Sequence, residues 1–481
     1  MDRKTLANEI WQACDIMRRD GGTSGVIEYM EQLSWLLFLK AYEATEERAK
    51  QETKAFGKEY KLVIERKYQW SSWAKKDLLA KELIEFIDRN LFPYLKSLYG
   101  TPGAEKIAMI FQELRGNRMK SGYNLKEVIE IINKIDFQKA QDSHVVSQAY
   151  EDLLLKMGQQ GGIAGEFYTP RPIIRLMIKI VNPQIGETIF DPFCGSAGFL
   201  VESYLHLREN NPGFSVNDYE TLQKKTFYGQ EKKPLPFLLG TINMILHGIQ
   251  TPTYIRTNTL EEDIRSVPEQ DKYDIIFTNP PFGGKEGKNI QQNFPVRSNA
   301  TELLALQYVA RKLKVKGRCG IVVPEGILFR GTAFAKVKKE LLENFNLHTI
   351  ISLPSGVFAN VSASGQGPKT NLLFFDRTGP TKQIWYYEHQ PPKGGKYTKT
   401  NPIKDEHLED CWQKWQKRTL SGNSWLVPVE EVVKSDFDLT AKNPTWKSEV
   451  SYKSPRELLN SIRSRENRIR EVISEVNKLL G

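Results

Sequence analysis

The spacing of the hydrophobic residues changes near residue 160 and divides the chain into two parts. Before that point, apolar residues recur at helical spacing in LANEIWQACDIMRRD, VIEYMEQLSWLLFLKAYEATEERA, KDLLAKELIEFIDRNLFPYLKSLYG and NLKEVIEIINKI. This spacing predicts a mostly helical first part. The glycine-rich stretch GQQGGIAGEFYTP (158–170) follows, and its glycines predict either a plain linker or a loop that grips a ligand.

Short β-type runs alternate with helical stretches in the second part. The runs are ETIF (187–190), TFYGQE (226–231), YIRTNTL (254–260), YDIIFTN (273–279), RCGIVVP (318–324), HTIISLP (348–354) and NLLFF (371–375). This alternation predicts an α/β fold, in which a mainly parallel sheet is covered by helices on both faces. Residues 380–445 show no clear period, and we expect them to be an irregular extension of this domain.

The last stretch again has helical spacing. A heptad seam, with Glu466 as its one charged misfit, consists of Leu459, Ile462, Ile469, Ile473, Val476 and Leu480. Such a helix can pack on its own domain, but a narrow seam after a loop-like stretch favours a docking arm. We therefore expect a helical domain at 1–157, an α/β domain at 158–445 and a C-terminal helical arm at 446–481.

Composition and charge narrow the classes of protein. The chain has 481 residues and a net charge of +10, which weakly favours a polyanionic partner. Its four cysteines form no CxxC pair and its six histidines no HxxxH pattern, so we expect no disulfide framework and no metal site. The start lacks a signal peptide, and the apolar run at 35–39 is too short to span a membrane, so we expect a cytoplasmic protein.

The first candidate site is the loop in IFDPFCGSAGFL (189–200), between a predicted strand and a helix. Gly195 and Gly198 let the backbone approach a ligand, Ser196 and Ala197 are small, and Asp191 ends the strand. The fit to the dinucleotide pattern GxGxxG is poor. A carboxylate suits a cation such as S-adenosylmethionine, whose sulfonium and ammonium groups are positive, although such turns also occur for packing reasons.

Glu231 ends the next strand, in TFYGQE. A carboxylate at this point can accept hydrogen bonds from both hydroxyls of a ribose. Alone it is equally well a solvated glutamate at a strand end. Its place after the glycine loop favours the ligand-binding interpretation.

The third candidate is NPPF, residues Asn279, Pro280, Pro281 and Phe282, which follows a buried strand. The Asn279 side-chain oxygen and the Pro280 carbonyl can accept hydrogen bonds from an aromatic amino group and make its nitrogen a better nucleophile. The Phe282 ring can stack on a base that has left its helix. The methyl group would pass directly to nitrogen, so positioning supplies most of the rate. The alternative is an ordinary Pro-Pro turn.

Together these segments resemble the modification (methyltransferase) subunit of type I restriction–modification systems. The resemblance spans nearly the whole chain, through LANEIWQACDIMRRD, EFYTPR, DPFCGSAGFL, NMILHGI, NPPFGG and LPSGVFA in the family's order. It implies a Rossmann-like methyltransferase sheet that uses S-adenosylmethionine to methylate N6 of adenine in double-stranded DNA. It also implies a specificity subunit bound by two copies of this chain, and a restriction subunit in the full complex.

The resemblance assigns further residues. Glu166, Phe167, Tyr168, Thr169, Pro170 and Arg171 would hold S-adenosylmethionine together with the glycine loop, and Asn258 would contact its adenine. An Asn at the first position of NPPF goes with adenine as the acceptor. No GxxxxGK[ST] motif occurs, so the ATP-driven motor lies in another chain.

Three alternatives remain. Cytosine C5 methylation is disfavoured because it needs a Pro-Cys nucleophile, and no cysteine here follows a proline. Methyltransferases that act on guanine N2 of RNA or on protein glutamine also use NPPF, but they should lack the helical start and the terminal seam. A non-catalytic scaffold of a DNA complex would have lost NPPF or the glycine loop, and both are intact.

Overall fold

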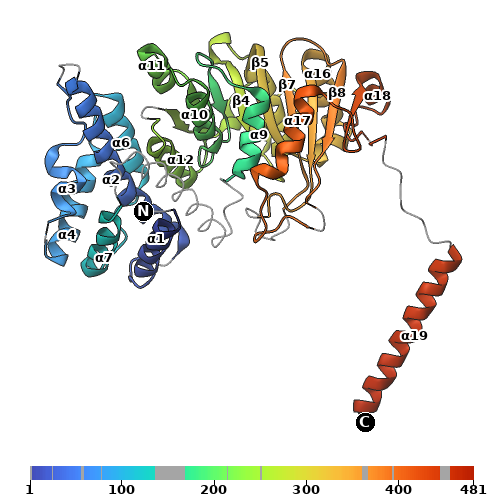
Figure 1. Cartoon of the computed structure of the whole chain (residues 1–481), viewed down its shortest axis with the longest axis horizontal. Helices are drawn as coiled ribbons and strands as arrows, with labels where there is room; N and C mark the ends of the chain where they lie inside the picture. The colour runs from blue at the N-terminus through green and yellow to red at the C-terminus, as the bar shows by residue number, and fades with distance from the viewer. Residues whose placement is uncertain are drawn as a thin grey trace. The chain divides into compact units, whose positions relative to one another are not determined.

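The computed structural model describes residues 3–23, 25–55, 59–76, 78–135, 168–213, 215–249, 252–359, 367–392, 395–441, 443–444 and 455–480. The chain divides into two compact units, Met1–Ala441 and Lys442–Gly481. The first unit contains a helical part and a large sheet (Figure 1). None of the helices among these residues is both long enough and apolar enough to cross a membrane.

The predicted helical first part is confirmed. Its helices are α1 (Arg3–Arg18), α2 (Val26–Ala55), α3 (Trp70–Trp73), α4 (Ala80–Phe86), α5 (Phe92–Lys96), α6 (Pro102–Glu113) and α7 (Gly122–Asn133), with short turns η1 (Arg66–Tyr68) and η2 (Ile87–Leu91). Helix α6 was not predicted, although Thr101 caps it by accepting a hydrogen bond from the Ala104 N–H at 3.2 Å.

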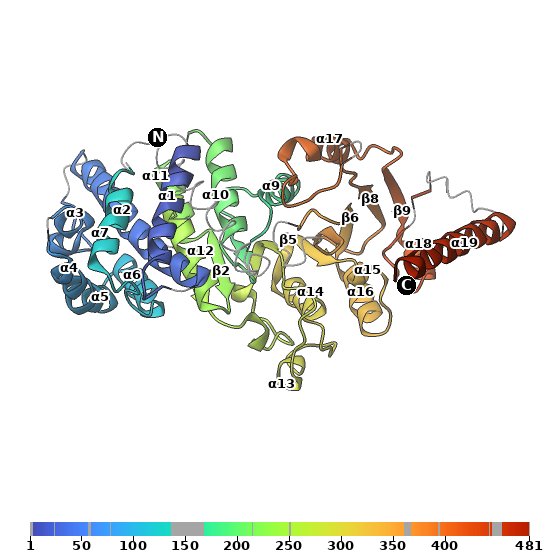
Figure 2. The same ribbon diagram turned by 90° about the horizontal axis from the view of Figure 1, so that it is seen from below.

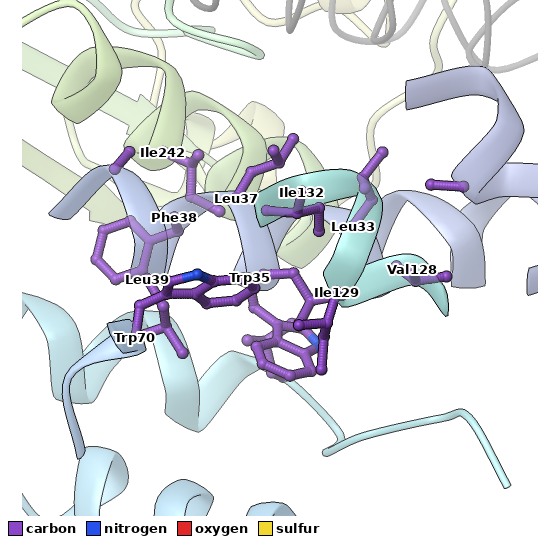
Figure 3. Packing of buried hydrophobic residues seen from close by; sticks show 14 of the residues in the cluster. Leu33, Trp35, Leu37, Phe38, Leu39, Trp70, Val128, Ile129, Ile132 and Ile242 are labelled. Atoms are coloured by element: carbon purple, nitrogen blue, oxygen red, sulfur yellow. The ribbon is translucent and has the colours of Figure 1, made fainter. Parts of the chain in front are cut away.

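Helix α2 is the centre of this helical part. Leu33, Trp35, Leu37 and Phe38 are all fully buried, since neighbours cover α2 on every side. One of these neighbours is α12 (Pro234–Leu246) of the second part, whose Ile242 belongs to the same hydrophobic cluster (Figure 3). The helical part and the sheet therefore share a core through α12.

Among the described residues, the sheet has nine strands in the order β3-β2-β1-β4-β5-β7-β6-β8-β9. Neighbours pair in parallel except at β5–β7, β6–β7 and β8–β9, so the predicted mainly parallel sheet is confirmed. The strands are β1 (Ile189–Asp191), β2 (Phe227–Glu231), β3 (Thr253–Arg256), β4 (Tyr273–Thr278), β5 (Leu313–Pro324), β6 (Asn346–Leu353), β7 (Thr370–Asp376), β8 (Gln383–Glu388) and β9 (Ser424–Pro428).

Helices cover both faces of the sheet (Figures 1 and 2). One hydrophobic cluster joins the sheet to α9 (Arg171–Val181), α10 (Gly198–Asn210) and α17 (Glu409–Lys417). Another joins it to α14 (Thr301–Lys312), α15 (Gly326–Phe329) and α16 (Ala333–Asn344). Two shorter helices, α11 (Val216–Lys224) and α13 (Lys288–Gln291), lie in the connections. In sheets of this kind, ligands bind at the carboxyl ends of the parallel strands.

The expectation that residues 380–445 are irregular is wrong. They form β8, β9, α17 and α18 (Val429–Lys434), and β8 extends the sheet by pairing with β6. Trp385, Tyr386 and Tyr387 in β8 are all buried. Strands covered on both faces lose the alternation of polar and apolar residues, so no period marked them in the sequence.

The described part of the second unit includes the long helix α19 (Pro455–Leu480). Within the described part of the chain its apolar seam is exposed, with Leu459, Ile462, Ile469 and Ile473 between 54% and 60% exposed.

Candidate functional site

Three segments meet at the carboxyl edge of the sheet, where β1 and β4 end side by side. Asp191 ends β1, Thr278 ends β4, and the Thr278 hydroxyl donates a hydrogen bond to Asp191 Oδ1 at 2.7 Å. The next residue, Asn279, donates from Nδ2 to Thr169 Oγ1 at 3.0 Å. Thr169 lies two residues before α9, so these hydrogen bonds link EFYTPR, the glycine loop and NPPF.

A cleft of about 340 Å³ opens between these segments. Its walls are Tyr168, Thr169, Arg171 and Ile174 from the start of α9, Asp191, Phe193, Cys194, Gly195, Ser196, Gly198 and Phe199 from the glycine loop, and Asn279. The cleft is thus bordered by the start of α9, by the glycine loop and by the first residue of NPPF.

Several predicted residues lie beside the cleft instead of lining it. Pro170 precedes α9, Ala197 precedes α10, and Pro280, Pro281 and Phe282 continue NPPF. Phe282 is half-buried and packs against the cluster beneath α9 and α10. Glu166 and Phe167 are outside the described residues.

Glu231 holds the glycine loop in place by accepting a hydrogen bond from its backbone. Its Oε2 accepts a hydrogen bond from the Gly195 N–H at 3.0 Å, and its Oε1 accepts one from the Lys233 N–H at 2.8 Å. The carboxylate does not line the cleft, and burial raises its pKa. Each of its oxygens still has a second lone pair, so contact with a ribose remains a prediction.

Asn258, which was predicted to contact the adenine of the cofactor, lies outside the cleft. Its exposed Nδ2 donates to Glu261 Oε1 at 3.0 Å, and the residue does not line the cleft. The hydrogen bond to Glu261 gives Asn258 a local role at the start of a short helical turn, η4 (Thr259–Glu261).

Asp191 gives the cleft its electrostatic character. The side chain is 1% exposed, and burial raises its pKa to about 7, although hydrogen bonds from Thr278 and the Phe193 N–H lower it. Burial disfavours the charged form of this carboxyl group, and a cation beside it would favour the ionised form. Arg171, itself 6% exposed, supplies a positive group to the same cleft.

The sequence reasoning missed the residues that hold the loop in place. The Tyr254 hydroxyl donates to the Gly195 carbonyl at 2.8 Å, and Asn243 Nδ2 donates to the Ser196 carbonyl at 2.8 Å. A Cβ atom on Gly240 would fall 2.6 Å from the Gly195 oxygen, so only glycine lets α12 come this close. The one available signal was Asn243 itself, a polar residue inside an apolar helix.

The cleft favours transfer to a bound nitrogen over nucleophilic catalysis by cysteine. Cys194 lines the cleft, but burial raises its pKa well above the ordinary value, so its thiol stays neutral. Asn279 Oδ1, in contrast, is a buried acceptor with no hydrogen-bond partner in the described part of the structure. A buried acceptor of this kind is well placed to receive an N–H group of a ligand.

Comparison with known proteins supplies the family. Residues 141–453 match the model of the N-6 DNA methylase family, and residues 6–132 match the HsdM N-terminal domain. The chain belongs to the N-6 DNA methylase family. The methylase is 40% identical to the type I restriction enzyme EcoEI methylase subunit of Escherichia coli, over 99% of this chain and 98% of that protein. It is a methylase subunit of the type I restriction enzyme family.

Solved structures agree with this assignment. The methylase matches a modification subunit assigned to a type I restriction enzyme of Vibrio vulnificus YJ016, with 38% identity, a TM-score of 0.85, and coverage of 92% of this chain and 97% of that one. It also matches a chain from work on complex assembly and conformational transition of the type I R-M system, with 49% identity, a TM-score of 0.80, and coverage of 99% and 98%. The predicted methyltransferase fold is thus confirmed.

Proposed function

We propose that this methylase subunit transfers a methyl group from S-adenosylmethionine directly to the N6 amino group of an adenine flipped out of double-stranded DNA. The observation that carries the proposal is the buried Asn279 Oδ1 at the end of β4, which has no hydrogen-bond partner among the described residues and lies in a cleft that also contains Asp191. Because its proposed substrate is chromosomal DNA, we propose that the subunit acts in the cytoplasm.

The residues of the cleft fit S-adenosylmethionine, which would supply an activated methyl group on its sulfonium. Its positive groups suit Asp191, and its carboxylate suits Arg171. The close approach of Gly198 to α9 supports this fit, since a Cβ there would fall 1.6 Å from Arg171 Nη1. Tyr168, Thr169, Gly195 and Ser196 complete the walls. The other residues predicted from the sequence remain proposed contacts: Glu166, Phe167, Pro170, Ala197, Glu231 and Asn258.

At the acceptor side, Asn279 Oδ1 and the Pro280 carbonyl would accept the two N–H groups of adenine. Both hydrogen bonds favour a pyramidal nitrogen and make its lone pair available. Phe282 would stack on the flipped base, and Pro281 stiffens the turn. The Asn279 acceptor would also suit an RNA guanine or a protein glutamine, and what favours adenine in DNA is the match of residues 141–453 to the N-6 DNA methylase family.

The proposal is tested by the product. The complex of this chain with its specificity subunit is incubated with methyl-labelled S-adenosylmethionine and duplex DNA from cells without DNA methylation, and the DNA is digested to nucleosides. We expect the label in N6-methyl-2′-deoxyadenosine alone. Label in a cytosine product, or none with folded and cofactor-bound protein, would contradict the proposal.

We propose that residues 1–157 form a helical domain, that residues 158–445 carry out catalysis and that residues 446–481 bind the specificity subunit. Two copies of the chain would bind one specificity subunit, and a restriction subunit would join the full complex. The exposed apolar seam of α19 and the type I family support this assembly.

Binding of the cofactor should depend on pH through Asp191. The folded pKa of about 7 lies above the ordinary 3.8, so the folded chain holds a proton between these values, and this group's contribution to stability falls as the pH rises through that window. A cationic ligand requires the ionised form. We expect affinity to rise up to about tenfold per pH unit below pH 7 and to level above it. Calorimetry should show the rise in wild type and its absence in Asp191→Asn.

The segment after NPPF is a candidate contact for DNA phosphates. It is closed by the bridge between Lys285 and Ala300 and held by Gln307, which bonds both the N–H and the carbonyl of Val296 at 2.9 Å. Lys285, Lys288 and Arg297 are exposed on it. Because Lys285 lies three residues after Phe282, DNA at the catalytic motif would pass close to this loop.

Replacing Lys285, Lys288 and Arg297 by glutamine should weaken DNA binding and its dependence on salt. Each lost phosphate contact is expected to make the slope of log affinity against log salt about 0.9 less steep. Fluorescence anisotropy with duplex DNA at several salt concentrations measures the slope.

The control for this experiment removes three other exposed cations, Arg208, Lys224 and Lys225, which lie near the opposite end of the strands. Their loss should leave the slope unchanged. Equal slopes for both triple variants would contradict a specific contact by the loop after NPPF.

A further inference from the structure

The amide of Asn279 is held by a residue far away in the sequence. Asn279 Nδ2 donates to Thr169 Oγ1 at 3.0 Å across a separation of 110 residues. Thr169 is 9% exposed, and its backbone is followed by Pro170, which fixes the start of α9. The hydroxyl therefore occupies a defined place against the catalytic motif.

The direction of this amide decides what the cleft offers to a ligand. The two ends of an asparagine amide have nearly the same shape, but one accepts hydrogen bonds and the other donates them. With Nδ2 bonded to Thr169, the buried Oδ1 is left as an acceptor without a partner among the described residues. The reversed amide would present N–H groups to the N–H groups of an amine, which cannot pair.

The backbone of Asn279 is already fixed by its neighbours. Thr278 is fully buried and bonded to Asp191, and the following Pro280 restricts the main chain of Asn279. What these constraints leave open is rotation of the side-chain amide. Of the hydrogen bonds that the structure gives for this side chain, the one to Thr169 is the bond that opposes its rotation.

We propose that Thr169 is a positioning residue for methyl transfer, which holds the Asn279 amide with Oδ1 toward the acceptor amine before that amine binds. This inference rests on the proposed function and adds to it. Preorganised polar groups lower a barrier because they need no reorientation when the reaction occurs. Thr169 acts through Asn279, in addition to being part of the cleft wall.

The test compares Thr169→Val, which keeps the shape and removes the hydroxyl, with Thr169→Ser, which keeps the hydroxyl. Each variant is assembled with the specificity subunit, and single-turnover methylation of duplex DNA is measured at saturating S-adenosylmethionine. We expect Thr169→Val to be slower by at least about tenfold at saturating S-adenosylmethionine, a loss that a change in cofactor affinity does not account for. Thr169→Ser should recover the rate to within about threefold.

Thermal unfolding shows whether the valine side chain destabilises the fold. If it does, Thr169→Ala, which removes the hydroxyl without adding bulk, replaces Thr169→Val, and the same rates and affinities are compared. The inference is overturned if the hydroxyl-free variant keeps the wild-type rate, if only its cofactor affinity changes, or if serine fails to restore the rate. A wild-type complex that forms no N6-methyladenine would overturn the proposed function, and this inference with it. Normal wild-type product with an unimpaired Thr169→Val would overturn the inference alone.

Discussion

Replacing Asn279 by alanine is expected to slow methyl transfer by roughly 10²–10³-fold, the loss seen when one preorganised hydrogen-bonding group is removed from an active site. The reason is the loss of Oδ1, the buried acceptor at the end of β4. Affinity for S-adenosylmethionine and the temperature of unfolding should stay close to wild type, because the contacts of Asp191 and the glycine loop remain. Single-turnover rates, equilibrium binding and thermal unfolding measure the three quantities.

The matched control is Asn210→Ala, which removes an exposed amide at the end of α10. Its rate should equal that of the wild type. An Asn279→Ala complex with more than about a third of the wild-type rate would contradict the assignment of Asn279 to the acceptor site.

Charging the seam of α19 is expected to abolish assembly with the specificity subunit. Ile469 and Ile473 are 59% and 54% exposed, and burying such a side chain at an interface contributes about 1.5–3 kcal/mol. Replacing both with glutamate removes this burial and adds two charges that would have to be desolvated. We expect the affinity for the specificity subunit to fall by at least about 100-fold.

The experiment measures complex formation by analytical ultracentrifugation. Asn467→Glu with Ser474→Glu is the control, since it adds the same charge at exposed positions of α19 outside the seam. The control should assemble normally, and both variants should bind S-adenosylmethionine like the wild type. Normal assembly of the seam variant would show that the specificity subunit binds elsewhere.

The sequence predicted the parts of the fold that local patterns encode. Buried runs such as YDIIFTN and the prolines or glycines after them fix both a strand and its end, so the meeting of NPPF with the glycine loop could be anticipated. In β8 both faces are covered, which removes the alternation that marks a strand, and its pairing with β6 depends on residues distant in the sequence.

The site shows the same limit. Asp191 and Asn279 could be placed at one edge because parallel neighbouring strands end together. The hydrogen bond between Thr169 and Asn279 spans 110 residues, and the bonds of Glu231 to backbone N–H groups depend on how the loop folds back over β2. No local pattern reports such contacts. The sequence therefore indicated a ribose ligand or a solvated glutamate at a strand end for Glu231, and its hydrogen bond to the glycine loop was missed.

The central claim is that this chain methylates adenine N6 in DNA, at a sequence chosen by its partner. The most direct test expresses it with its specificity subunit in cells without other DNA methylation and sequences the genomic DNA by a modification-sensitive method. The account predicts N6-methyladenine confined to one split recognition sequence, and its absence when Asn279→Ala replaces the wild type. Folded, cofactor-bound protein that leaves adenine unmodified would contradict it.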